Sequence, residues 1–170
     1  MRPSRLIWYF ADEGKSIEES INIIAATIYR ESLSPLVGTV ARKITESCGE
    51  NWMCKISKIH DWLKKRFVYR EDPKEVDTFK SATYSLHEII NQGYFTGDCD
   101  DATILSGALL KASGFVVRLM VMSRRREPDA PLEHIAVLVE LPNMKKMYVD
   151  LTVNEPIDFR GRRVVVSDPV

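Results

Sequence analysis

The sequence predicts an α+β fold in which helices come first and an antiparallel sheet follows. Up to about residue 112, apolar residues recur at intervals of three and four, which is the spacing of one helix face. After Gly114 the pattern changes to short apolar runs separated by polar turns, which is typical of antiparallel strands. Between the two parts, Cys99 stands where a loop turns into a strongly apolar helix. These observations favour a buried helix that begins at Cys99 and packs on the sheet.

The N-terminal part contains clear helix start signals. Ser16 and Glu19 form a capping box, in which each side chain satisfies a free backbone amide of the first turn. Pro35 is tolerated in the first turn of a second helix, and Asn51 is a good N-cap for a third. The expected elements are a strand over Leu6–Phe10 and helices over about 17–31, 35–48 and 52–67.

The second part begins with a short helix over about 83–91 and the Cys99 helix over 99–112. Asp98 is the expected N-cap of the Cys99 helix, because its carboxylate can accept a bond from a first-turn amide. Gly114 ends that helix. The strands are then expected over residues 116–122, 134–141, 147–153 and 163–167.

The composition is that of one globular domain. The chain has 170 residues, of which 45% are hydrophobic and 28% charged, so it can bury a sizeable core. Its formal net charge of zero gives no field toward nucleic acid or a membrane surface. No apolar run approaches the roughly 20 residues that a membrane-spanning helix needs. We therefore predict neither a nucleic-acid partner nor a membrane partner.

Cys99, His134 and Asp150 are the candidate site residues. A thiol at a helix N-terminus is exposed to the helix dipole, which favours the nucleophilic thiolate. His134 opens an apolar strand, and its imidazole titrates near neutrality and can accept the thiol proton. Asp150 lies on the next strand, where a carboxylate can fix the imidazole tautomer. Each residue alone also has a structural explanation, as a packed thiol, an edge histidine and a cap.

A resemblance to a known family rests on several segments taken together. Gly97–Asp101 with its apolar helix, Gly114–Arg118, His134 and Tyr148–Thr152 resemble the transglutaminase-like superfamily. Ile59–Tyr69 is similar to the helix and tyrosine that precede the cysteine of that family. The similarity spans about residues 50–155, and the leading helices also resemble versions found in bacterial viruses and prophages.

The resemblance implies a papain-like cysteine site. Cys99 would be the nucleophile, His134 the general base and acid, and Asp150 the residue that orients the histidine. The chain would be a single transglutaminase-like domain over residues 1–170, with a helical N-terminal extension over 1–45 and a catalytic core over 46–170.

The activity implied is acyl transfer on peptide or carboxamide bonds through a thioester, with a protein or peptide as substrate. Hydrolysis is favoured over crosslinking, because the domain is small and carries no added sandwich modules. The alternative is a non-catalytic structural or binding module, such as a component of a virion or prophage.

Two features of the expected site need further partners: the negative charge beside the thiol and the stabilisation of the oxyanion. Asp98, Asp100 and Asp101 crowd the thiol with negative charge, which opposes thiolate formation, and we expect Arg118 to neutralise one of them. For the oxyanion, the Cys99 amide is one expected donor, and Tyr69 and Tyr84 are candidates for the second.

The remaining cysteines and the basic triplet leave alternatives open. Three cysteines without a secretory signal predict reduced thiols and a cytoplasmic or virion-associated protein, although Cys48 and Cys54 can pair in an oxidant. Their spacing does not match a structural zinc site, and there is no phosphate-binding glycine loop, so no metal or cofactor is predicted. The triplet Arg124–Arg126 is either a solvated loop or a contact for an anionic ligand.

Overall fold

The structure is a computed structural model that describes residues 7–11, 16–73, 76–154, 159–160 and 162–170. Its helices are α1 (Ile17–Ser32), α2 (Pro35–Thr45), the 3₁₀ helix η1 (Glu46–Cys48), α3 (Trp52–Lys64), α4 (Ala82–Gln92) and α5 (Cys99–Ala112). Its strands are β1 (Ile7–Ala11), β2 (Phe67–Tyr69), β3 (Val76–Lys80), β4 (Phe95–Gly97), β5 (Val116–Met122), β6 (His134–Glu140), β7 (Lys146–Val149) and β8 (Val164–Val166).

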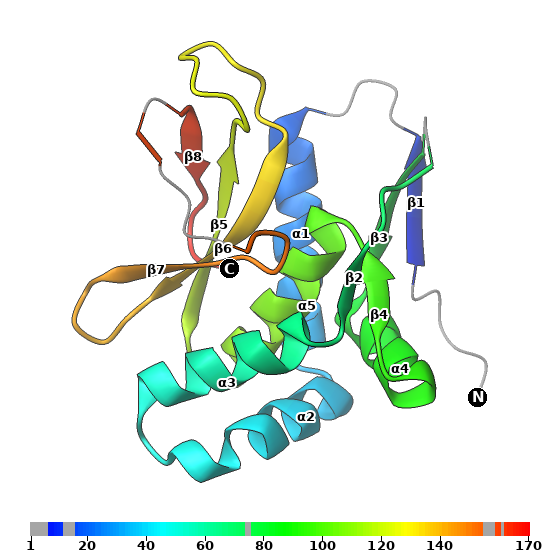
Figure 1. Cartoon of the computed structure of the whole chain (residues 1–170), viewed down its shortest axis with the longest axis vertical. Helices are drawn as coiled ribbons and strands as arrows, with labels where there is room; N and C mark the ends of the chain where they lie inside the picture. Colours follow the sequence, from blue (N-terminus) through cyan, green and yellow to red (C-terminus); the bar gives the residue numbers. More distant parts are fainter. Residues whose placement is uncertain (1–6, 12–15, 74–75, 155–158, 161) are drawn as a thin grey trace.

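Helix α5 occupies the centre of the molecule (Figure 1). It contacts the four other α-helices and strands β3, β4, β5 and β6, and every residue from Asp101 to Leu110 is buried. An apolar helix surrounded in this way gains free energy from burial around its whole circumference. Gly107 gives α1 room to approach, because a Cβ there would lie 2.8 Å from Ile28 Cδ1. The predicted α+β fold, with the Cys99 helix packed on an antiparallel sheet, is confirmed.

The main sheet has the strand order β7-β6-β5-β8, and all its pairs are antiparallel. In the β5–β6 register Met122 is opposite His134, and in the β6–β7 register Val137 is opposite Val149. The second register leaves Asp150 just beyond the end of β7, diagonal to His134. Sheet pairing therefore brings two candidate site residues to one edge of the molecule.

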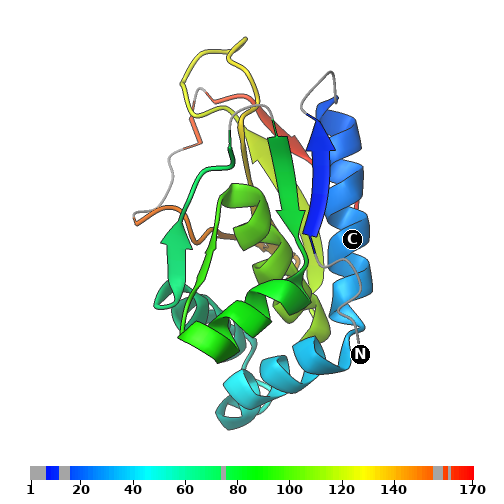
Figure 2. The same ribbon diagram turned by 90° about the vertical axis from the view of Figure 1, so that its right-hand side faces the viewer.

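Two small sheets complete the fold. Strands β1 and β3 pair antiparallel, as the blue and green arrows in Figure 2 show. Strands β2 and β4 pair in parallel, with Tyr69 opposite Gly97, and β4 leads directly into α5. The sequence did not predict β2, β3 or β4.

The helix caps agree with the sequence. The Ser16–Glu19 capping box is present, and Asn51 Oδ1 accepts from the Cys54 amide at 2.9 Å. Helix α3 ends at Lys64, three residues before the expected end. Among the described residues, no helix combines the length and the apolar character needed to cross a membrane.

The cysteines correct one expectation. Cys48 and Cys54 form a disulfide that joins the end of η1 to the first turn of α3, so two of the three thiols are not reduced. Only Cys99 is a free cysteine. This pairing is the alternative that the sequence analysis left open for oxidising conditions.

Candidate active site

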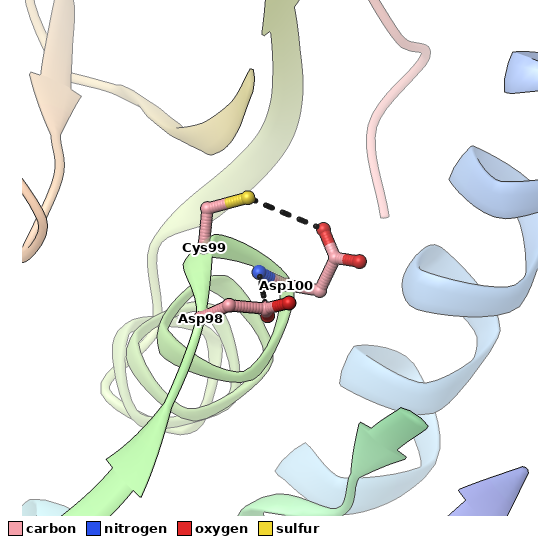
Figure 3. Close-up of side chains that lie close together, drawn as sticks. All are labelled: Asp98, Cys99 and Asp100. Carbon is pink, nitrogen blue, oxygen red and sulfur yellow. Dashed lines mark hydrogen bonds between the residues drawn. The ribbon is translucent and has the colours of Figure 1, made fainter. Parts of the chain in front are cut away.

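Cys99 is the first residue of α5, directly after the N-cap Asp98. The Asp98 carboxylate accepts a hydrogen bond from the Asp100 amide at 3.0 Å, as predicted for an N-cap. The Cys99 thiol is half-buried and donates to Asp100 Oδ1 at 3.6 Å, so thiol and carboxylate face each other above the helix (Figure 3). Gly97 is required here, because a Cβ would lie 2.5 Å from the Asp101 side chain.

His134 and Asp150 form a buried pair. His134 Nε2 lies 2.6 Å from Asp150 Oδ2, and the two side chains are 7% and 2% exposed. The other ring nitrogen, His134 Nδ1, is buried and has no hydrogen-bond partner among the residues that the structure describes. An imidazole held by a carboxylate on one side therefore presents a free nitrogen on the other side.

Asp150 is fully engaged by hydrogen bonds. Its Oδ1 accepts from the Thr152 amide at 2.8 Å and from the Thr152 hydroxyl at 2.7 Å, and its Oδ2 also accepts from the Tyr148 hydroxyl. Burial alone would raise the pKa of Asp150, but the hydrogen bonds from His134, Tyr148 and Thr152 outweigh burial and lower the pKa to about 2. Asp150 is thus a permanent carboxylate at neutral pH.

The turn after Asp150 is held in place by a lysine from α3. Lys64 Nζ donates to the carbonyl of Leu151 at 2.5 Å and to the carbonyl of Val153 at 2.9 Å. These carbonyls flank Thr152, which in turn donates to Asp150. Lys64 therefore positions the carboxylate through the backbone.

The surroundings of the thiol favour its neutral form. Burial raises the pKa of Cys99 well above its usual range, and the charges of Asp100 and Asp98 raise it further, whereas the Ile135 amide and Arg124 lower it. In the part of the chain that the structure describes, no hydrogen bond joins Cys99 to His134. The helix N-terminus alone does not produce a thiolate.

The prediction that Arg118 neutralises one of the carboxylates beside Cys99 is wrong. Arg118 pairs with Glu140 across the β5–β6 ladder and does not reach the carboxylates beside the thiol. Asp101 is instead held by the Lys80 amide, which donates to Oδ1 at 2.8 Å, while Oδ2 is buried and has no partner in the described part of the chain. Burial raises the pKa of Asp101 to about 7 despite that hydrogen bond.

Two hollows meet at His134. The Cys99 hollow, of about 480 Å³, is lined by Cys99 and its neighbouring carboxylates, with apolar side chains of α1. The Arg162 hollow, of about 420 Å³, is lined by Met122, Thr152, Val153 and Arg162. Four residues line both hollows: Tyr69, Glu71, Arg124 and His134.

The structure distinguishes the two tyrosines considered as oxyanion donors. Tyr69 lines both hollows, and its side chain raises the pKa of the neighbouring Arg124 guanidinium. Tyr84 lies on the first turn of α4, with its ring 5.8 Å from Lys80 Nζ, and lines neither hollow. Of the two tyrosines, only Tyr69 borders the site.

Among the described residues, one group has the geometry to hold a metal ion. It consists of Asp98, Cys99 and Asp100, whose potential ligand atoms all lie within 4.8 Å of one another. The cysteines considered for zinc do not assemble, because Cys48 and Cys54 are bonded to each other.

Comparison with known proteins identifies the family. The family model described as the transglutaminase-like superfamily matches residues 38–151, which include Cys99, His134 and Asp150. The chain belongs to the transglutaminase-like superfamily. No match is found among the curated proteins.

Solved structures with the same fold are similar to this superfamily member. A Parabacteroides distasonis protein described as a "putative protease" has a TM-score of 0.61 and 14% sequence identity, over 89% of this chain and 30% of that one. A Cytophaga hutchinsonii protein described as a "putative cysteine protease" has a TM-score of 0.55 and 18% identity, over 86% of this chain and 49% of that one. The chain thus spans less than half of the length of either protein, and the likeness establishes the fold.

Proposed function

We propose that this protein is a cysteine-dependent acyl-transfer enzyme that acts on peptide or carboxamide bonds. The observation that carries the proposal is His134, whose Nε2 is held by Asp150 and whose unpartnered Nδ1 is buried at the hollow that Cys99 lines. A base held by a carboxylate beside a nucleophile is the arrangement that covalent catalysis needs. The names of the two structural neighbours, both given as proteases, support the same class of reaction.

In the proposed reaction the proton moves as the substrate reacts. His134 Nδ1 takes the thiol proton while Cys99 Sγ attacks the carbonyl carbon, and Asp150 stabilises the imidazolium that forms. The Cys99 amide, at the N-terminus of α5, donates to the oxyanion, and the Tyr69 hydroxyl is positioned at the same hollow. A neutral resting thiol is compatible with this sequence, because the thiolate is needed only when the carbonyl is bound.

The tetrahedral intermediate then collapses. The C–N bond breaks, His134 gives its proton to the leaving amine, and the acyl group remains on Cys99 as a thioester. Water attacks the thioester with His134 as the base, which releases a carboxylic acid and restores the thiol. We favour water over a second amine as the acceptor, so the proposed outcome is hydrolysis.

Peptide mass spectrometry tests this proposal. The protein is incubated with a diverse peptide pool and with methylamine, and the products are compared with those of Cys99→Ser. Hydrolysis yields fragment pairs whose summed mass gains one water, whereas transamidation yields methylamides. We expect the former, with no products from Cys99→Ser.

Equal products from both proteins would contradict a thiol nucleophile. If no peptide changes and Cys99 also resists activated esters, the protein is instead a non-catalytic binding module with the same fold.

A further inference from the structure

Arg124 stands at the boundary between the two hollows. It is an exposed residue of the loop between β5 and β6, which projects beyond the sheet in both views (Figures 1 and 2). Its side chain lines the Cys99 hollow and the Arg162 hollow, and its charge acts on the Cys99 thiol. Its neighbour Arg125 lines neither hollow and pairs with Glu127 at 3.8 Å.

The backbone that carries Arg124 is held firmly for a loop. The Ser123 amide donates to the Arg163 carbonyl at 3.0 Å, and the Arg163 amide donates to Ser123 Oγ at 3.1 Å. The Arg162 guanidinium donates to the carbonyls of Ser123, at 3.2 Å, and Arg124. Tyr69 lines the same two hollows as Arg124 and raises the pKa of its guanidinium. An exposed cation is thus positioned in advance, which lowers the entropy cost of binding a ligand there.

The two hollows carry opposite charge. In the Cys99 hollow, Arg124 faces four carboxylates: Glu71, Asp98, Asp100 and Glu133. Of the described residues that line the Arg162 hollow, two are arginines, Arg124 and Arg162, and one is a carboxylate, Glu71. An anionic group is therefore repelled by the first hollow and attracted by the second, which also borders His134.

We propose that Arg124 binds a carboxylate of the substrate in the Arg162 hollow, next to the reacting carbonyl, so that the preferred acyl donors are acidic. This inference deepens the proposed function and rests on it. A guanidinium has five donors in a planar arrangement, which can bind both oxygens of a substrate carboxylate. Met122 and Val153 provide apolar contact for the carbon chain that carries the carboxylate.

Two small alkylating reagents test the anion preference without any amide turnover. Iodoacetate and iodoacetamide both form an S–C bond to Cys99 and release iodide, and they differ in the carboxylate. Because both need the thiolate, the ratio of their rates cancels any change in the pKa of Cys99. The ratio is measured at one alkaline pH by mass mapping of the Cys99 peptide.

Arg124→Gln should lower the iodoacetate-to-iodoacetamide ratio about fivefold, the size expected for a charged contact that is partly open to solvent. Arg124→Lys should keep part of the preference, and Arg125→Gln should match the unaltered protein. The effect should shrink in high salt, because exposed charges are screened. Circular dichroism confirms that each variant is folded.

An unchanged ratio in Arg124→Gln would overturn the inference, and so would equal slowing of both reagents, which assigns Arg124 to the thiol alone. If Arg124→Gln lowers the iodoacetate-to-iodoacetamide ratio but the protein cleaves no peptide, the proposed function is contradicted and the anion-binding role of Arg124 is supported. If peptides are cleaved, replacing Glu by Gln in a good substrate should raise KM, and Arg124→Gln should abolish that difference.

Discussion

The low pKa of Asp150 makes a prediction about the pH dependence of stability. The carboxylate has a pKa of about 2 in the folded protein, against 3.8 for a free aspartate, because four hydrogen bonds outweigh its burial. Each pKa unit corresponds to about 1.4 kcal/mol, so the shift contributes roughly 2.4 kcal/mol to the free energy of unfolding. Since the folded pKa is the lower one, this contribution is present above about pH 5 and is lost as the pH falls toward 2.

Asp150→Asn removes the titrating group and should remove this part of the acid sensitivity. Urea unfolding between pH 2 and pH 6 gives the free energy of unfolding for both proteins. The difference between the two ends of the range should be smaller in Asp150→Asn by about 2 kcal/mol. The exposed loop variant Asp129→Asn is the matched control and should reproduce the unaltered curve.

Parallel curves for Asp150→Asn and the unaltered protein would refute this reasoning. They would mean that the hydrogen bonds to Asp150 do not favour its ionised form. The histidine would then lack the fixed negative charge that the proposed mechanism assigns to its partner.

Three further predictions concern the surroundings of the site. The pKa of Asp101 is shifted upward, to about 7, so Asp101 stabilises the fold below about pH 4 and loses that stabilisation as the pH rises through 7. Asp101→Asn should abolish this decrease in the free energy of unfolding measured with urea. Alkylation of Cys99 by iodoacetamide should stay slow at pH 8, because burial and then Asp100 raise the thiol pKa, and Asp100→Asn should speed it up. Lys64→Met should disorder the turn beside Asp150 and lower kcat about tenfold or more on any identified substrate. Lys65→Met is the exposed control, and NMR of the turn is the structural readout.

Local signals explain which parts of the fold were predictable. Helix caps depend on residues two or three apart, and the Ser16 box and the Asp98 cap are both present as the sequence indicated. The long strands β5 and β6 have continuous apolar runs that identify them. In contrast, β2 and β4 have three residues each and exist through pairing with each other, which no local pattern reveals.

The site was predictable where chain order and sheet pairing suffice. Adjacent antiparallel strands bring His134 and Asp150 together, and this followed from the order of the strands. Tyr148 was missed, although it lies two residues before Asp150 and so shares its side of the strand. Arg118 was assigned wrongly because its partner, Glu140, depends on the exact register of β5 and β6.

Contacts that depend on tertiary packing lay beyond the sequence. Lys64 reaches the turn after Asp150 from 87 residues earlier, because the last turn of α3 lies beside it in the folded chain. The neutral thiol also depends on packing, since burial is the largest cause of the raised pKa of Cys99. A sequence can predict a helix N-terminus and its dipole, but it does not show how far the Cys99 thiol is buried.

Acylation of Cys99 by p-nitrophenyl acetate, followed by mass spectrometry of the Cys99 peptide, tests the central claim most directly. The thiol attacks the ester, nitrophenolate leaves, and the acetyl group stays on sulfur. We expect acetylation of Cys99, trapped by acid quenching before water hydrolyses the thioester, at a rate that is at least tenfold lower in His134→Ala and unchanged in His87→Ala, whose histidine is exposed on α4. Acetylation at the same rate without His134, or none on Cys99 in the folded protein, would contradict the assignment of this pair as nucleophile and base.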